Sequence, residues 1–210
     1  MNTETLLIYS VVSFFYVITP GPAILLAISN GMNGGLRAVL MSTLGNISGL
    51  LVISVLSILG LGAIMATSSS LFTLAKFAGA AYLIYLGIRQ LMIRPEQLAG
   101  ISTQSPPKER HTSAHFFEGF VLAISNPKAI LFFTALFPQF LSFSTPLLPQ
   151  YVIMTGLFMA ISFGSLFSWG LISHTAKHQL GSDRGIKWFR RISGGLFIGV
   201  GIGLTQFKNT

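Results

Sequence analysis

Three stretches of this chain are too long and too apolar for an ordinary soluble domain. No Asp, Glu, Lys or Arg occurs in residues 5–36, 38–75 or 129–174. Each stretch exceeds the ~20 residues that one helix needs to cross a bilayer. The mean hydropathy of the whole chain, +0.71, fits the same class. The chain is therefore predicted to be an integral membrane protein embedded in a lipid bilayer.

The predicted fold class is all-α, with six transmembrane helices. The apolar runs place these helices at about Leu6–Asn30, Val39–Thr67, Leu71–Leu91, Phe116–Leu141, Leu147–Ser173 and Ile192–Phe207. The first run should remain as a span, because residues 1–4 lack the basic region of a cleaved signal peptide. We expect one membrane domain, made of a three-span repeat (1–92), a cytoplasmic loop (93–115) and a second three-span repeat (116–210).

The formal net charge of +8 does not indicate a nucleic-acid partner, because the basic residues fall in loops between apolar runs. The loops expected after spans two and four contain no Lys or Arg. The loops after spans one, three and five contain ten of the thirteen: Arg37, Arg89, Arg94, Lys108, Arg110, Lys177, Arg184, Lys187, Arg190 and Arg191. Basic loops stay in the cytoplasm, so both termini are expected outside. The chain has no cysteine and no metal-ligand spacing, and we expect neither a metal nor a cofactor.

Two of the apolar runs are broken by proline at corresponding places in the two halves. The breaks consist of Thr19, Pro20, Gly21 and Pro22 in the first half and of Ser125, Asn126, Pro127 and Lys128 in the second. A rise of 1.5 Å per residue places both breaks near the bilayer midplane. Three spans per half would insert the halves in opposite orientations, as an inverted repeat. The alternative explanation for the similarity of the halves is that apolar helices share a common composition. Paired interrupted spans are a sequence indicator of a transporter's binding site.

Each break can divide a span into two half-helices, with the second half beginning at the midplane. Thr19 or Asn126 can serve as an N-cap, followed by proline near the first helical position. Helix N-termini present free N–H groups and partial positive charge, which suit a carboxylate. Gly21 would let a ligand approach the backbone closely. The alternative interpretation is two kinks with no ligand role, which transmembrane helices tolerate.

Lys128 places a cation deep in an apolar run. Glu118 is the nearest acid in the same helix, about 15 Å away along the axis. An ionisable group at this depth must face a cavity, a ligand anion or water. Two interpretations stay open: Lys128 contacts the ligand or a proton directly, or it is a structural donor to backbone carbonyls that the break leaves free.

Several motifs, in this order and spacing, resemble the LysE/RhtB family of bacterial amino-acid exporters. They are Pro20-Gly21-Pro22, Lys76-x-x-Gly79-Ala80-x-Tyr82-Leu83-x-Tyr85-Leu86-Gly87, Asn126-Pro127-Lys128-Ala129-x-Leu131-Phe132-Phe133 and Pro138-Gln139-Phe140. With the six-span layout they cover nearly the whole chain. The resemblance implies an exporter in the bacterial inner membrane, usually driven by the proton motive force, with protons as the coupling ion.

The chain departs from that family in one respect. Some relatives carry an acidic residue in span two after the glycine corresponding to Gly45, and some carry one in span five. Here Asn46 follows Gly45, and span five offers only the small polar groups of Ser162, Ser165 and Ser168. The identity of a proton-carrying residue is therefore open, and Asn46 is expected either to line a cavity or to pair with a neighbouring helix.

Three charged residues outside the breaks are candidates for gating or coupling. Lys76 and Arg191 open spans three and six, where anchoring at the membrane interface is the favoured interpretation. Glu118 lies near the expected cytoplasmic mouth, where an entrance or a loop-pairing role is favoured over proton transfer.

The leading hypothesis is an amino-acid exporter that works by alternating access and is not an enzyme. The carboxylate would be held by the two half-helix N-termini and Lys128, and the ammonium by Asn46 and by carbonyls near Thr19 and Ser125. Since this site is net positive, neutral substrates such as threonine, homoserine or leucine are expected over basic ones.

Three alternatives are less well supported by the sequence. An exporter of metal cations would be expected to show cysteines or midplane carboxylates, whereas an exporter of other small solutes stays open as an alternative. An intramembrane enzyme would need an acid–base set at the midplane. A purely structural subunit does not explain Lys128. The sequence leaves the oligomeric state open, a homo-oligomer included.

Overall fold

The computed structural model describes residues 3–67, 111–142 and 144–175, with side chains described through residue 60 in the first range. Ten separate positions are also described: Phe77, Ala81, Ile84, Tyr85, Ile88, Met92, Gly195, Ile198, Gly199 and Ile202. The spans predicted at Leu71–Leu91 and Ile192–Phe207 otherwise lie outside the described residues, as do Lys76 and Arg191.

The described part of the chain is all-helical. Its elements are α1 (Thr3–Ile18), α2 (Pro22–Asn33), α3 (Gly35–Thr67), α6 (Thr112–Ser125), α7 (Pro127–Leu131), the π-helix η2 (Phe132–Leu136), the 3₁₀ helix η3 (Phe137–Phe140) and α8 (Leu147–Thr175). Gly35–Gly60 and Leu147–Thr175 are each long and apolar enough to cross a membrane. Together with two bent pairs they make up to four spans among these residues.

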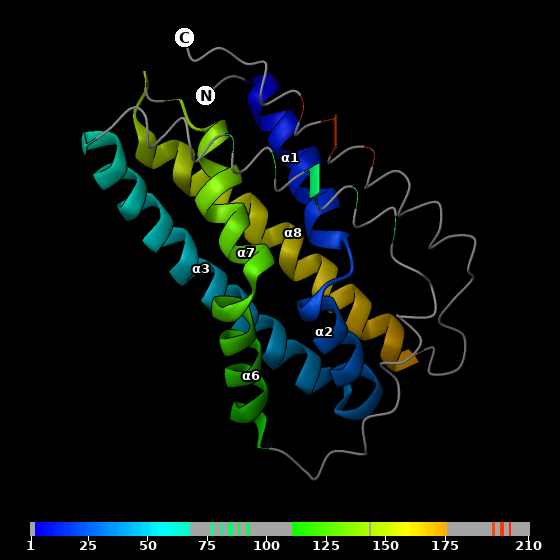
Figure 1. Ribbon diagram of the computed structural model, residues 1–210. Helices are drawn as coiled ribbons and strands as arrows, with labels where there is room; N and C mark the ends of the chain where they lie inside the picture. The colour runs from blue at the N-terminus through cyan, green and yellow to red at the C-terminus, as the bar shows by residue number, and fades with distance from the viewer. Residues whose placement is uncertain are drawn as a thin grey trace.

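The two bent pairs are the proline-broken runs. α1 and α2 meet at 54°, and α6 meets the segment Pro127–Phe140 at 51°. Proline removes a backbone donor and disfavours helical geometry in the residue before it, which explains the position of both bends. The pairs run in opposite directions, because α1 leads into α2 from top to bottom whereas α6 leads into α7 from bottom to top (Figure 1).

The helix ends alternate between the two sides of the bundle. In Figure 1 the start of α1, the end of α3 and the start of α8 lie at the top, and the α2–α3 turn, the start of α6 and the end of α8 lie at the bottom. That turn is a single residue, Gly34, before α3 begins at Gly35 with φ of +74°, a value that favours glycine. α2 extends past the predicted end at Asn30, and α3 begins before the predicted start at Val39. Residues Thr112–His115, which the sequence predicts as loop, form the start of α6.

The second broken run loses α-helical geometry after Leu131. Pro138 has no N–H, and its ring would clash with the carbonyl of Thr134 in a regular α-helix. The chain instead forms a π-helical turn in which the N–H of Phe137 donates to the Phe132 carbonyl. The bypassed carbonyl of Phe133 accepts a hydrogen bond from the Ser57 hydroxyl on α3. A neighbouring helix thus satisfies the backbone group that the irregular turn leaves free.

Glycines allow two pairs of helices, α3 with α6 and α2 with α8, to cross at backbone contact. A Cβ on Gly45 of α3 would lie 1.9 Å from the Phe116 carbonyl oxygen on α6, and one on Gly119 would lie 2.0 Å from the Ser42 oxygen. A Cβ on Gly31 of α2 would lie 2.2 Å from the Gly170 oxygen on α8. Small residues at such crossings give close packing between helices in a membrane.

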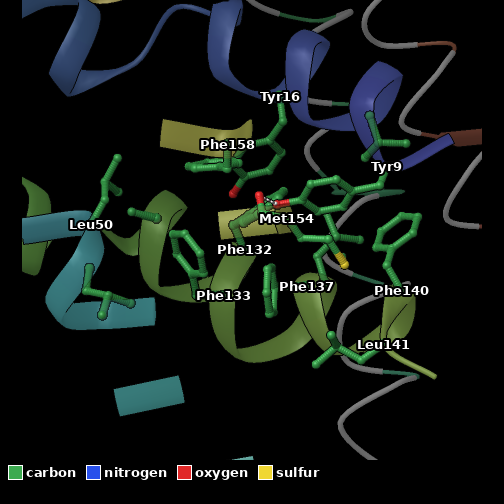
Figure 2. Close-up of a cluster of buried hydrophobic side chains, with 14 of the residues drawn as sticks. Tyr9, Tyr16, Leu50, Phe132, Phe133, Phe137, Phe140, Leu141, Met154 and Phe158 are labelled. Carbon is green, nitrogen blue, oxygen red and sulfur yellow. Dashed lines mark hydrogen bonds between the residues drawn. The ribbon is translucent and has the colours of Figure 1, made fainter. Parts of the chain in front are cut away.

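An aromatic cluster fills the bundle above the two breaks. Figure 2 shows Tyr9 and Tyr16 of α1 facing rings from η2, η3 and α8. The rings of Phe132 and Phe158 are 4.2 Å apart between centroids, and those of Tyr9 and Phe140 are 5.3 Å apart. The Tyr9 hydroxyl donates to the Met154 carbonyl at 3.0 Å. The cluster joins α1 to α8.

Candidate functional site

A cavity of about 50 Å³ lies where the two breaks meet. It has room for a few water molecules. Its walls come from both broken runs, from α3 and from α8: Tyr16, Val17, Thr19, Gly21, Ala23, Ile24, Asn46, Leu50, Asn126, Lys128, Ala129, Phe158, Ser162 and Leu166. The structure therefore brings together five residues predicted from sequence, namely Thr19, Gly21, Asn46, Asn126 and Lys128.

The N-terminus of α2 opens onto this cavity without a side-chain cap. Its N-cap is Gly21, followed by Pro22 at the first helical position, and no side chain among the described residues caps it. Ala23 and Ile24, which carry first-turn N–H groups, line the cavity. The expectation that Thr19 caps this helix is wrong, because its hydroxyl donates to the Phe15 carbonyl within α1 at 2.7 Å.

The Lys128 ammonium lies beside this uncapped helix end. A Cβ built on Gly21 would be 3.8 Å from Nζ and 3.6 Å from Cδ of Lys128. Gly21 has φ of −158°, extended backbone that any residue adopts, so its conformation does not demand glycine. What the missing side chain provides is space between Lys128 and the start of α2. A cation and the free N–H groups of a helix N-terminus both favour an anion placed near them.

Lys128 also ties the two broken runs together. Its Nζ donates a 2.8 Å hydrogen bond to the Thr19 carbonyl, one of the carbonyls left free at the C-terminal end of α1. The Tyr16 hydroxyl donates in turn to the Lys128 carbonyl, and Nζ lies 4.9 Å from the centre of the Tyr16 ring. A cation is favoured at a helix C-terminus and over an aromatic face. This arrangement matches the interpretation of Lys128 as a donor to a carbonyl that the break leaves free.

The second break is capped as the sequence indicates. Asn126 is the N-cap of α7, Pro127 follows at the first helical position, and the Asn126 side chain accepts from the Lys128 N–H at 3.0 Å. The cap satisfies one N–H group of α7. Of the two half-helix N-termini expected to face a ligand, that of α2 is thus the more available.

Two polar side chains on the cavity wall have no hydrogen-bond partner within the described parts of the chain. They are the amide of Asn46 on α3 and the hydroxyl of Ser162 on α8, and both residues are only 4% exposed. Asn46 was expected to line a cavity or to pair with another helix, and the structure places it on the cavity. Ser162 is one of three small polar residues of span five, and no signal in the sequence distinguishes it as the one that faces this space.

The other predicted site residues lie off the cavity. Pro20, Pro22 and Pro127 shape the bends without lining it, and Ser125 is exposed and is not among the lining residues. Glu118 lies half-buried on α6, with a carboxylate oxygen 3.8 Å from Nδ1 of His115. Among the described residues, no three His, Cys, Asp or Glu side chains gather as metal ligands would.

Comparison with known proteins places this helical membrane protein among the translocators. The family model described as "LysE type translocator" matches residues 14–206. The chain therefore belongs to the LysE type translocator family, as its motifs indicate. No solved structure matches it at a significant level.

Several curated relatives align with nearly the full chain. The "uncharacterized membrane protein YrhP" of Bacillus subtilis (strain 168) is 30% identical over 205 residues, which cover 95% of this chain and 97% of the relative. An uncharacterized membrane protein of Vibrio cholerae is 29% identical over 208 residues, with 99% and 100% covered. The homoserine/homoserine lactone efflux protein of Salmonella typhimurium is 28% identical over 209 residues, with both chains fully covered. The protein is a multi-pass membrane translocator, and the confirmed family supports export of a small molecule.

Proposed function

We propose that this protein exports neutral amino acids from the cytoplasm across the bacterial inner membrane, with threonine, homoserine and leucine as the leading candidates. The observation that carries this proposal is the position of the Lys128 ammonium beside the uncapped N-terminus of α2, inside a cavity between the two broken runs. Membership of the translocator family and the efflux protein among the relatives support the direction of transport and the class of substrate.

The substrate carboxylate binds between Lys128 and the first-turn N–H groups of Ala23 and Ile24. These groups supply one full and one partial positive charge to the same space. Gly21 leaves that space open because it has no side chain. To contact the carboxylate, Nζ of Lys128 weakens or releases its bond to the Thr19 carbonyl.

The released Thr19 carbonyl then accepts a hydrogen bond from the substrate ammonium. This exchange keeps every charged group paired, which matters because an unpaired charge or carbonyl is costly in this environment. Without substrate, the hydrogen bond between Lys128 and the Thr19 carbonyl thus occupies the two groups that the substrate binds. Binding would loosen the connection between α1 and α7, the kind of change that alternating access requires.

A neutral side chain suits this site better than a basic one. The acids of the whole chain are Glu4, Glu96, Glu109, Glu118 and Asp183; Glu4 and Glu118, the two that the structure describes, do not line the cavity. A lysine or arginine substrate would add a second cation to a space that already holds Lys128. Apolar wall residues such as Leu50, Phe158 and Leu166 offer such a cation no partner.

The transport cycle uses the two broken runs as matching halves of an inverted repeat. The opposite directions of α1–α2 and α6–α7 support this proposal (Figure 1), as does the cavity at the junction of their breaks. The proton motive force drives export, in line with the resemblance to the exporter family. With basic loops in the cytoplasm, both termini lie outside.

Efflux from preloaded cells tests the proposal. Cells that express the protein, or an equally abundant Lys128→Met variant, are loaded with labelled amino acids, and efflux is followed with and without a protonophore. We expect faster efflux of a neutral amino acid that depends on Lys128 and is slowed by the protonophore. Efflux that expression leaves unchanged for every amino acid tested would contradict the proposal.

A further inference from the structure

One stripe of α8 faces the cavity, and Ser162 is its only polar member. Phe158, Ser162 and Leu166 follow one another at intervals of four residues, so they share one face of the helix, and all three line the cavity. Phe158 packs against Phe132 in the aromatic cluster. Leu166 belongs to a smaller apolar cluster around Ile24 on α2. Ser162 is therefore held at mid-height in the cavity by the packing of its two neighbours.

The Ser162 hydroxyl differs from many helical hydroxyls in this protein. Serine and threonine in an apolar helix commonly bond a carbonyl one turn earlier in the same helix. Ser10, Ser48, Thr134, Ser173 and Thr175 all do so, at 2.6–3.0 Å. Ser162 makes no such bond within the described chain, although it is nine-tenths buried. Its hydroxyl is available to a partner in the cavity.

A second available polar group lies on α3. The Asn46 amide lines the same cavity, is 4% exposed and has no hydrogen-bond partner among the described residues. An amide supplies both donors and an acceptor, and a serine hydroxyl supplies a donor and acceptor lone pairs. Leaving both without a partner in an apolar surrounding is unfavourable, so the pair indicates a ligand that brings a polar group of its own.

We propose that Ser162 and Asn46 form a side-chain subsite that recognises the hydroxyl of a small hydroxylated amino acid. This inference rests on the proposed export of neutral amino acids and specifies which of them the site prefers. The carboxylate and ammonium engage Lys128, the start of α2 and Thr19. The side chain then reaches the remaining wall, where a hydroxyl satisfies Ser162 and Asn46 and a methyl group does not.

Threonine and valine test this subsite, because they have nearly the same shape and differ by a hydroxyl in place of a methyl. An apolar pocket separates such isosteres poorly, whereas a site that hydrogen-bonds the hydroxyl rejects the analogue that lacks it. One neutral hydrogen bond corresponds to up to about a tenfold difference in affinity. The size of the cavity has the same effect on both substrates.

The experiment measures the ratio of threonine to valine transport by purified protein in proteoliposomes. Wild type is compared with Ser162→Ala and with the control Ser165→Ala. Ser165 lies three residues further along α8, and its hydroxyl is also buried and unpartnered, but it does not line the cavity. We expect wild type to favour threonine, Ser162→Ala to lower the ratio at least fivefold with valine transport maintained, and Ser165→Ala to keep the wild-type ratio.

Each outcome decides the inference. A wild-type ratio near one, an unchanged ratio in Ser162→Ala, or an equal fall in Ser165→Ala would overturn the subsite while leaving amino-acid export in place. A wild-type protein that moves no amino acid would overturn the proposed function and the subsite with it. If Ser162→Ala fails to insert, Ser162→Cys keeps the size of the side chain, supplies only a weak donor and should also lower the ratio.

Discussion

Replacing Gly45 with alanine should separate helices α3 and α6. The added Cβ would lie 1.9 Å from the Phe116 carbonyl oxygen and 2.8 Å from its carbon. Real Cβ atoms essentially never approach closer than 3.0 Å, so the α6 backbone must move by about 1 Å. Backbone atoms cannot rotate aside as a flexible side chain can. Forcing extra volume into a packed contact costs about 1–3 kcal/mol.

The same substitution on α8 provides the matched control. Gly164 is exposed on the surface of its helix, and a Cβ there meets nothing within 4 Å. Alanine is a better helix former than glycine by about 1 kcal/mol, so Gly164→Ala should be neutral or stabilising. Both variants add one methyl group to a helix of the same membrane domain, and their effects on stability are expected to differ in sign.

Thermal unfolding of the purified protein in detergent measures this difference. For a protein of this size about 1 kcal/mol shifts the Tm by about 2–4 °C. We expect Gly45→Ala to lower the Tm by about 3–10 °C and Gly164→Ala to leave it unchanged or raise it. Equal Tm values for the two variants would refute the close crossing of α3 and α6.

Three further predictions concern orientation and the cavity. In this cysteine-free chain, Ser144→Cys should react with an impermeant thiol reagent from outside the cell and Ser113→Cys only from inside; the reverse pattern would overturn the orientation. Gly21→Ala should fold normally, because its Cβ would meet only ordinary contacts at 3.6 Å or more. It should bind an amino acid at least tenfold more weakly, and unchanged affinity in a binding titration would exclude the carboxylate from this space. Excess lysine should compete for efflux less than threonine does, and equal competition would point to Glu118 as a counter-charge for basic substrates.

Much of the site follows from local sequence, because helix breaks and caps are local events. Asn126 before Pro127 predicts an N-cap and a helix start, and the structure has both. The depth of Lys128 in an apolar run indicates that it needs a partner inside the protein, and it has one in Thr19. The expectation for Thr19 as a cap was wrong because a second proline, Pro22, moves the helix start to the residue after Gly21.

The remaining features depend on how the helices rotate and cross, which local sequence does not determine. Ser162, Ser165 and Ser168 are equivalent candidates in the sequence, and only packing of α8 turns Ser162 toward the cavity. The carbonyl that Lys128 contacts belongs to a residue more than a hundred positions away in the chain. Likewise, the π-helical turn after Leu131 is stabilised by Ser57 on another helix. Each of these features needs the three-dimensional arrangement.

The central claim, that Lys128 holds the substrate carboxylate, is tested most directly by equilibrium binding. The affinity of purified wild type and of Lys128→Met is measured for threonine and for threonine amide, which lacks the carboxylate. A hydrogen bond to a charged group contributes about 1.5–3 kcal/mol, so Lys128→Met should weaken threonine binding by about 10–150-fold and leave the weak binding of the amide nearly unchanged. Equal threonine affinity in the two proteins, or an equal loss for threonine and its amide, would show that Lys128 only ties the two broken helices together.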